Sequence, residues 1–408
     1  MSFFPCSCPL SCNKTRSECQ KKSTHHQSEP STSVSLLSQP SLPLVPSLSS
    51  PLQSSTVEHQ CLATLTDHSS YVSSLALSRK SLFTGSSNGD IRVWPREPPF
   101  SSTGNIVAAG SGGVKSLVIL GDKLISAHQD HKIRVWKTTD DSKYKCVATL
   151  PTMNDRFTSL FSQKSYVEVR RHKKSTWVHH VDAVSSLALS QDGALLYSAS
   201  WDRSFKIWRA SDFKCLESIE KAHDDAINAI VVSRDGFCYT GSGDKTIKVW
   251  IKKDKSHSLV ATLKKHLSAV NALAVSEDGK VLYSGACDRS ILVWERLSNG
   301  DGDDDELHMT VVGALRGHTK AIMCLAVASD LVLSGSADKS LRVWRRGLLE
   351  KDGYSCLAVL EGHTKPVKCL AVSVSGSGSD SNSDYSCMVY SGSLDLSVKV
   401  WNLRVSTV

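Results

Sequence analysis

Six sets of a histidine, a serine or threonine, an aspartate or asparagine, and a tryptophan recur in the same order along the chain. Histidine, serine and aspartate are the residues of a serine hydrolase, in which histidine takes a proton from the attacking hydroxyl and aspartate orients the histidine. The sets are His68/Thr84/Asn88/Trp94, His180/Ser198/Asp202/Trp208, His223/Thr240/Asp244/Trp250, His266/Ser284/Asp288/Trp294, His318/Ser334/Asp338/Trp344 and His363/Ser391/Asp395/Trp401.

The repetition of these sets argues against an active site. A nucleophilic site needs one nucleophile, one base, one orienting group and an oxyanion site beside a single pocket. The sequence also contains neither a phosphate loop ending in Gly-Lys-Ser/Thr nor a His-Glu-x-x-His metal motif. We therefore predict that the sets are structural chains of buried hydrogen bonds. We expect no catalytic residue, no cofactor and no metal, and hence no enzyme.

A seventh set is incomplete. Ser126, Asp130 and Trp136 are present, but Gly110 stands where the histidine is expected. The first set is altered in another way, because Asn88 accepts a hydrogen bond without carrying a charge. We expect the repeat around Ser126 to lack a histidine and to be less rigid than the others, with faster amide hydrogen exchange.

Seven short apolar runs end in tryptophan, each six residues after an aspartate or asparagine. They are Asn88 to Trp94, Asp130 to Trp136, Asp202 to Trp208, Asp244 to Trp250, Asp288 to Trp294, Asp338 to Trp344 and Asp395 to Trp401. A period of about 40–45 residues with this ending is typical of a β-propeller blade, which buries its faces only against its neighbours. The chain is therefore predicted to be all-β, with seven blades of four strands.

The order of strands predicts how the ring closes. The last repeat stops soon after Trp401 without a fourth strand, while an unpaired strand, Cys61–Leu65, precedes the first repeat. Because exposed sheet edges invite aggregation, we expect residues 60–66 to complete blade 7. This gives a propeller over residues 60–404, with an insert at 151–179 in the loop between blades 2 and 3, and a C-terminal tail at 405–408.

Residues 1–59 are rich in serine and proline and are predicted to be a disordered tail. The spacing of Cys6, Cys8, Cys12 and Cys19 fits no common zinc module. Lipid attachment at these thiols and a plastid transit peptide stay open as alternatives to a solvated tail.

The recurring Gly-His, Ser-Gly-Ser, Asp and Val-Trp elements resemble the WD40 repeat over residues 60–404. The resemblance implies that each set links the loop between strands d and a, strand b, the b–c turn and strand c. It also implies a non-catalytic scaffold for protein–protein interactions. The stretch Arg170–Val184 further resembles plant WD40 proteins of the JINGUBANG type, which implies a plant regulatory protein acting through partners.

The hydrogen-bond sets define one side of the ring, here called the top face, which carries the loops between strands d and a and the b–c turns. Residues just before the aspartates are expected to be exposed there, including Gln129, Trp201 and Leu394. A tryptophan in an exposed turn is a candidate interface hot spot, unless it packs against a neighbouring loop. The loops 299–306 and 376–384 are expected to be flexible and to lie on the opposite face.

The insert 151–179 lies in a top-face loop and holds six lysines and arginines against two acidic residues. We expect a helical turn over Asp155–Phe161 and a strand over Tyr166–Val169. Its candidate binding residues are Arg170, Arg171, Lys173, Lys174 and Trp177. Basic residues beside an aromatic suit an acidic protein segment, a phosphorylated peptide or a nucleic acid, and a solvated run of charge is the alternative.

Two other functions stay open. The sequence Trp401-Asn402-Leu403-Arg404 nearly matches the Trp-Asp-x-Arg ending of substrate receptors for cullin–RING ubiquitin ligases. An RNA-associated propeller using the basic insert is the second alternative, although no RNA-recognition motif is present. We favour a protein partner, either a transcription regulator or a ubiquitin-ligase adaptor, over nucleic acid, and we expect a monomer.

The compartment is inferred from the cysteines and the apolar runs. Cys215, Cys238, Cys287, Cys324 and Cys369 lie in or near predicted strands, where a thiol packs as a small apolar group. No apolar run approaches 18 residues and no secretory signal is present. We therefore expect a reducing compartment, the cytoplasm or the nucleus, and no membrane span.

Overall fold

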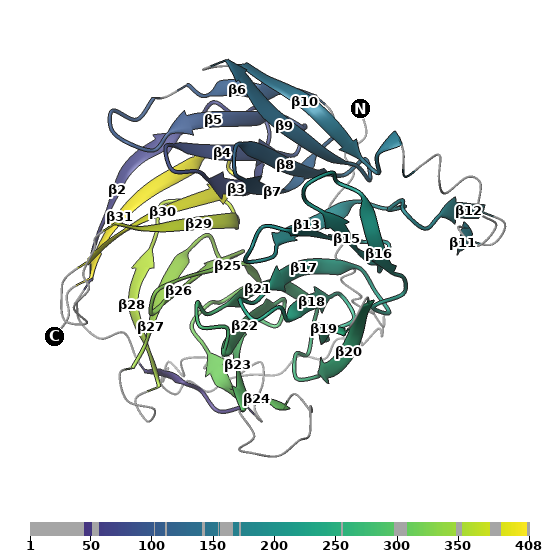
Figure 1. Ribbon diagram of the computed structural model, residues 1–408. Helices are drawn as coiled ribbons and strands as arrows, with labels where there is room; N and C mark the ends of the chain where they lie inside the picture. The colour runs from purple at the N-terminus through teal and green to yellow at the C-terminus, as the bar shows by residue number, and fades with distance from the viewer. Residues whose placement is uncertain are drawn as a thin grey trace, which may run out of the picture. The chain divides into compact units, whose positions relative to one another are not determined.

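The computed structural model describes residues 45–50, 57–101, 103–110, 112–140, 143–153, 155, 166–170, 173–253, 256–297, 308–347, 353–375 and 385–405. Within the unit Pro40–Val408, seven antiparallel four-stranded blades follow one another around a ring, and a fifth, parallel strand extends the sheet of one of them (Figure 1). The prediction of an all-β, seven-bladed propeller is confirmed.

Each blade runs from an inner strand a to an outer strand d. In blades 1 to 3 these strands are β3 (Val72–Leu77), β4 (Ser81–Ser86), β5 (Ile91–Pro95) and β6 (Asn105–Ala108); β7 (Val114–Leu120), β8 (Lys123–His128), β9 (Ile133–Asp140) and β10 (Lys143–Leu150); and β13 (Val184–Leu189), β14 (Leu195–Ser200), β15 (Phe205–Arg209) and β16 (Cys215–Ile219). In blades 4 and 5 they are β17 (Ile227–Val232), β18 (Cys238–Ser242), β19 (Ile247–Lys253) and β20 (Ser256–Leu263); and β21 (Val270–Val275), β22 (Val281–Ala286), β23 (Ile291–Leu297) and β24 (His308–Leu315). In blades 6 and 7 they are β25 (Ile322–Ala328), β26 (Leu331–Ser336), β27 (Leu341–Arg346) and β28 (Tyr354–Leu360); and β29 (Val367–Ser375), β30 (Tyr385–Ser393), β31 (Val398–Val405) and β2 (Val57–Leu65).

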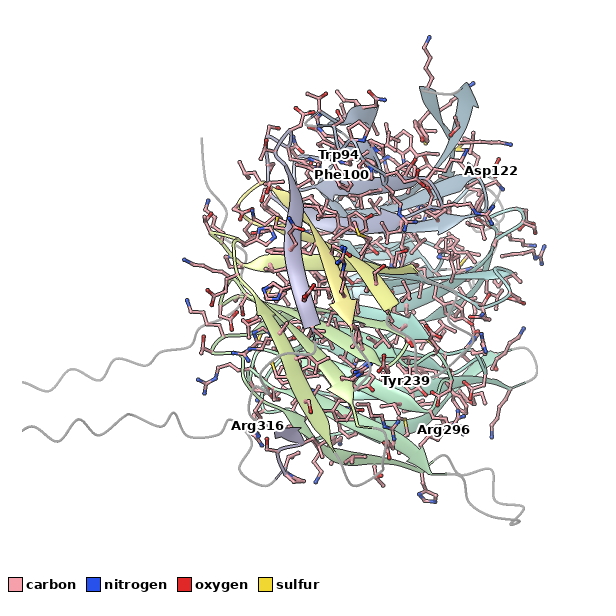
Figure 2. All side chains as sticks on the ribbon, turned by 90° about the vertical axis from the view of Figure 1, so that its left-hand side faces the viewer. Trp94, Phe100, Asp122, Tyr239, Arg296 and Arg316 are labelled. Atoms are coloured by element: carbon pink, nitrogen blue, oxygen red, sulfur yellow. The ribbon has the colours of Figure 1, made fainter. Side chains whose placement is uncertain are left out.

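The hydrophobic core lies between neighbouring blades. One cluster joins Val72 and Trp94 of blade 1 to Tyr390 and Val398 of blade 7, and Phe100 packs against it (Figure 2 labels Trp94 and Phe100). Strand b of most blades carries a glycine that lets the next blade approach. A Cβ at Gly285, for example, would meet Ile322 Cγ2 of blade 6 at 2.4 Å. Each blade is thus stabilised mainly by its neighbours.

The ring closes as predicted. The N-terminal strand β2 pairs antiparallel with β31, with Cys61 opposite Trp401 and Leu65 opposite Val398. The strand begins at Val57, three residues before the expected start at 60, and β31 continues to Val405, one residue past the expected end. Both strands extend beyond the predicted bounds because their pairing continues past the repeat pattern, with Glu58 opposite Arg404 and Val57 opposite Val405.

The prediction of disorder through residue 59 is wrong for residues 45–50. This segment lies along the outer strands of blades 5 and 6, where β1 (Ser49–Ser50) pairs parallel with β28 and Ser47 pairs with Ala314 of β24. The serine- and proline-rich composition hid the two apolar side chains, Val45 and Leu48, that hold it. Figure 1 shows the segment in purple beside β24 and β28.

Several expectations concern residues outside this description. They include the cysteines at 6, 8, 12 and 19, the loops 299–306 and 376–384, and residues 406–408 of the C-terminal tail. In the described part, no helix has the length and apolar character needed to cross a membrane.

Candidate functional site: the top face

In blades 3 to 7 the predicted sets form continuous hydrogen-bond chains. In blade 3, Trp208 Nε1–H donates to Ser198 Oγ at 2.9 Å, Ser198 Oγ lies 2.9 Å from His180 Nε2, and His180 Nδ1 lies 3.0 Å from Asp202 Oδ2. The corresponding distances in blades 4 to 7 are 2.7–2.9 Å. Each chain ties strands b and c to both top-face loops of its blade.

These chains are built for structure. Ser198 and its counterparts Thr240, Ser284, Ser334 and Ser391 are fully buried, so their hydroxyls have no access to a substrate. Burial lowers the pKa of His180, His318 and His363 and outweighs the opposing effect of the paired aspartates. Burial alone would raise the pKa of Asp202 and Asp395. The interactions with the histidine and with a neighbouring hydroxyl outweigh burial and lower the pKa of both groups, for Asp395 to about 2. The His180–Asp202, His318–Asp338 and His363–Asp395 pairs therefore consist of a neutral imidazole and a carboxylate.

The expectation that blade 2 lacks a histidine is wrong. His128, two residues after Ser126 on strand b, places its Nε2 at 2.7 Å from Ser126 Oγ, and Trp136 Nε1–H donates to the same hydroxyl at 2.7 Å. His128 Nδ1 lies 2.9 Å from the carbonyl oxygen of Gly112 in the d–a loop. The histidine thus enters from strand b instead of the loop, and a search at the usual spacing misses it. The released Asp130 binds Arg134.

Blade 1 has the weaker chain. His68 Nε2 lies 2.6 Å from Thr84 Oγ1, and Trp94 Nε1–H donates to that hydroxyl at 2.9 Å. Asn88, however, turns toward Ser69 and Asp90, and its Nδ2 donates to Asp90 Oδ2 at 2.7 Å. His68 Nδ1 is consequently buried without a hydrogen-bond partner among the described residues. Burial, followed by the nearby Arg92 charge, lowers the pKa of His68 to about 4.

The buried cysteines show no sign of reactivity. Burial raises the pKa of Cys215 and Cys324 to about 12, so both stay thiols at neutral pH. The nine cysteines in the described part of the chain form no disulfide. Within the same residues, no group of three or more His, Cys, Asp or Glu side chains is arranged to hold a metal.

Trp201 is held in place on the top face. It is half-buried, and Lys115 Nζ of blade 2 lies 4.8 Å from the ring centroid in a cation–π contact. Of the other residues proposed for this face, Gln129 is exposed and Leu394 is half-buried. The sequence left open whether Trp201 is exposed for binding or packs against a neighbouring loop. In the structure it contacts Lys115 of the neighbouring blade and keeps part of its surface accessible.

The sequence interpretation missed the residues that follow each aspartate. In six blades a non-glycine residue with φ between 68° and 76° occupies this position, and the six residues are His131, Arg203, Lys245, Arg289, Lys339 and Leu396. All six are exposed. Four of them are cations on the consecutive blades 3 to 6, and none of the four makes an ion pair with a residue that the structure describes. The recurrent Asp-Arg and Asp-Lys pairs were the signal in the sequence.

The insert between blades 2 and 3 contains a small hairpin. β11 (Tyr166–Arg170) pairs antiparallel with β12 (Lys173–Thr176), with Arg170 opposite Lys173. Three of the four basic candidates, Arg170, Lys173 and Lys174, thus lie on paired strands, and Arg171 lies outside the described residues. The expected helical turn over 155–161 also lies almost entirely outside them.

Trp177 anchors the end of the insert. It is half-buried and packs against the core between blades 2 and 3. Its carbonyl oxygen accepts a hydrogen bond at 2.6 Å from the buried Lys206 Nζ, which also binds Ser218 and Glu220. Trp177 is therefore mainly a packing residue, and the insert joins blade 3 at a rigid point.

Arg404 lies away from the other candidates. It is exposed near the end of β31, with Glu58 of β2 and Ser386 of β30 opposite it. Strand c starts at the b–c turn on the top face, so the end of β31 reaches the opposite side of blade 7. The structure thus brings together Gln129, Trp201 and Leu394 on one face and leaves Arg404 on the other.

Comparison with known proteins identifies the repeats. The family model for the WD domain, G-beta repeat, matches residues 59–95, 171–209, 213–250, 257–295, 309–345 and 354–402, more than half of the chain. The chain belongs to the WD40 repeat family. The blade without a match is blade 2, where the histidine comes from strand b. The propeller of this WD40 protein is also similar to the crystal structure of the WD40 β-propeller domain of Doa1, with a TM-score of 0.60 and 20% identity over 85% of this chain and 97% of that one.

Curated relatives match smaller parts of the chain. The WD40 protein is 25% identical to an F-box/WD-40 repeat-containing protein of Arabidopsis thaliana over 65% of this chain and 44% of the relative. It is 25% identical to zinc finger CCCH domain-containing protein 62 of the same plant over 42% of this chain and 38% of the relative. The Dictyostelium discoideum protein HIRA is 29% identical over 30% of this chain and 13% of its own length. The chain thus spans less than half of each of these relatives.

Proposed function

We propose that this WD40 protein is a non-catalytic scaffold whose top face binds an acidic or phosphorylated segment of a partner protein. The main support for this proposal is a row of exposed cations, Arg203, Lys245, Arg289 and Lys339. A non-glycine residue at positive φ costs on the order of 1 kcal/mol, and Gly89 shows that the same turn accepts glycine. Cations kept at strained positions on four blades in a row favour a binding role.

The surroundings of this row support a mixed polar and aromatic interface. Trp201 offers a ring fixed by Lys115, and the hairpin β11–β12 adds Arg170, Lys173 and Lys174 in the loop that leads to blade 3. The face is not uniformly basic, because Asp182 and Asp224 lie in the d–a loops of blades 3 and 4. Charges of both signs favour a protein partner over the uniform phosphate backbone of RNA.

The biological setting rests on weaker support. The resemblance of residues 170–184 to plant WD40 proteins of the JINGUBANG type and the Arabidopsis relatives support a plant regulatory protein. Cysteines scattered through the strands without a disulfide framework favour a reducing compartment, the cytoplasm or the nucleus. We infer that the protein is a monomeric propeller that binds a transcription regulator or a ubiquitin-ligase adaptor.

Proximity labelling in plant cells with the full chain tests the proposal. One variant, Arg203→Gly/Lys245→Gly/Arg289→Gly, removes charge without straining the turns, since glycine prefers their backbone conformation. A second variant changes Arg170, Arg171, Lys173 and Lys174 to alanine, and Arg404→Ala on the opposite side is the matched control. A small set of proteins lost from either top-face variant and kept by the control supports the proposal. Identical protein sets from all variants would exclude it.

The same experiment separates the alternatives. Arg404 is exposed, as a ligase-adaptor contact requires. Loss of a ligase adaptor from Arg404→Ala alone would support the substrate-receptor function instead of the top-face function. RNA-dependent labelling that disappears steeply with added salt would support the RNA-associated alternative.

A further inference from the structure

The outer strands of blades 5 and 6 hold a peptide that comes from elsewhere in the chain. The segment Val45–Ser50 precedes β2 in the sequence but runs along blades 5 and 6, from β24 to β28. Three main-chain hydrogen bonds of 2.9 Å fix it: Ala314 N–H to Pro46 O, Leu48 N–H to Ala314 O, and Tyr354 N–H to Leu48 O. Addition of an extended peptide to a sheet edge in this way is a known mode of peptide recognition.

Two apolar side chains anchor the segment. Val45 is 6% exposed and packs with Leu292, Trp294 and Ala314 of blade 5. Leu48 packs in the cluster of Tyr283, Trp344 and Tyr354 at the junction with blade 6. Pro46 and Ser47 between them are exposed. The site therefore recognises an apolar residue and, three positions later, a leucine.

Arg316 closes one end of this site. Its Nη2 donates a hydrogen bond of 2.6 Å to the carbonyl oxygen of Val45. Figure 2 labels Arg316 at the lower edge of the ring. The contact is to the main chain, so it fixes the direction and register of the peptide and does not depend on the side chain at position 45.

Gly313 shows that the propeller is shaped for the leucine. It is buried opposite Val293 in β24, and a Cβ there would lie 2.4 Å from Leu48 Cγ. The equivalent residue of blade 1 is Asn105 and that of blade 3 is Glu217. In the remaining four blades it is alanine, namely Ala63, Ala148, Ala261 and Ala358. Blade 5 alone among the seven thus lacks a side chain at this position, where Leu48 needs the space.

We propose that the groove of β24 and β28, with Gly313, Arg316 and Tyr354, is a peptide-binding site for extended segments of partner proteins that carry an apolar residue and, three positions later, a leucine. Val45–Ser50 is its built-in occupant and exchanges with such segments. Only two apolar anchors hold the occupant, while the six residues 51–56 tether it to β2. A short tether keeps its effective concentration near the millimolar range. A partner must therefore displace the segment Val45–Ser50, which acts as an intramolecular competitive inhibitor of the site. This site is independent of the top-face function.

The test uses the full chain and a synthetic fluorescent peptide of residues 42–52, Leu-Pro-Leu-Val-Pro-Ser-Leu-Ser-Ser-Pro-Leu. Val45→Asp/Leu48→Asp releases the internal segment and leaves the blades intact. We expect this variant to bind the peptide about tenfold or more tightly than the wild-type chain, in which the tethered segment competes. A control peptide with aspartate in place of leucine at position 48 should not bind. Failure of the folded released variant to bind the peptide would overturn the proposal.

Gly313→Ala in the released variant supplies the second arm. Four blades carry alanine at this position, so the variant should fold, but its methyl group fills the space of the leucine. We expect it to lose peptide binding, and unchanged binding would contradict the proposed site. Hydrogen exchange at the Ala314 and Tyr354 amides should rise in the released variant and fall again when the peptide is added. If the wild-type chain is instead a dimer that Leu48→Asp dissociates, a second copy fills the groove and the proposal is wrong.

Discussion

His128 Nε2 lies 2.7 Å from Ser126 Oγ, two residues away on the same strand of blade 2. In the six other blades the histidine reaches the equivalent hydroxyl from the preceding loop. In four of those blades a serine at the His128 position, such as Ser200, donates instead to a carbonyl of the d–a loop. His128 combines both tasks, because it binds Ser126 through one nitrogen and faces the Gly112 carbonyl with the other.

We predict that His128→Ala destabilises the protein by about 1–3 kcal/mol, because Ser126 and the Gly112 carbonyl each lose a buried partner. Urea unfolding followed by tryptophan fluorescence measures the change. His131→Ala in the neighbouring exposed turn is the control and should change stability by about 0.5 kcal/mol or less. Equal effects of the two substitutions would show that His128 has no special structural role.

The order of blade rigidity follows from the same contacts. We expect blade 2 to exchange its amide hydrogens about as slowly as blade 4, since His128 completes its network. Blade 1 should exchange faster, because His68 Nδ1 has no hydrogen-bond partner in the described part of the chain. Mass spectrometry of deuterated peptides distinguishes the blades, and faster exchange in blade 2 than in blade 1 would contradict this order.

Blade 1 can be converted to the common pattern. Asn88→Asp alone should destabilise, because the new carboxylate would lie beside that of Asp90. Asp90 stands where the other blades carry a hydroxyl that binds the aspartate, as Ser204 does in blade 3. The double variant Asn88→Asp/Asp90→Ser should therefore be more stable than the wild type by about 1 kcal/mol. A double-mutant cycle in urea should show strong coupling, and additive effects would refute the explanation.

Stability should fall in mild acid. Burial lowers the pKa of His68 and His128 to about 4, while an unfolded histidine titrates near 6.5. Between these values the unfolded chain binds protons that the folded chain does not, so the free energy of unfolding decreases as pH falls. The slope is about 1.4 kcal/mol per pH unit for each histidine. Urea unfolding from pH 7.5 to 4.5 should show this decrease, and it should be shallower in His68→Gln/His128→Gln.

Trp201→Ala tests whether the fixed ring serves binding or stability. Loss of the Lys115 contact should lower stability by only about 1 kcal/mol. Capture of the top-face partner should fall about tenfold or more if the ring is a hot spot. Pull-down with the purified variant measures the second effect, with Gln129→Ala as a nearby control. A large loss of stability with unchanged capture would assign Trp201 to packing alone.

Much of the fold was predictable because the Asp-to-Trp spacing repeats in every blade and states where each strand c ends. Closure by residues 60–66 followed from counting strands. Residues 45–50 were missed because their two anchors, Val45 and Leu48, lie among serines and prolines that are typical of disorder. His128 was missed because its contact depends on three-dimensional placement and not on spacing. The cations after four of the aspartates were visible in the sequence, but only the positive φ angles made them distinctive.

The pairing of β2 with β31 delays closure of the ring during synthesis, because β2 is made long before β31. Thr64 Oγ1 accepts a hydrogen bond from Lys399 Nζ at 3.0 Å across 335 residues of sequence. At ribosomal rates this separation corresponds to tens of seconds, roughly 20–70 s. For that period the first outer strand lacks its native partner, and its polar residues Glu58, His59 and Gln60 oppose edge-to-edge aggregation. Release of the last blade from the ribosome, and not formation of the first, is therefore the event that completes the ring.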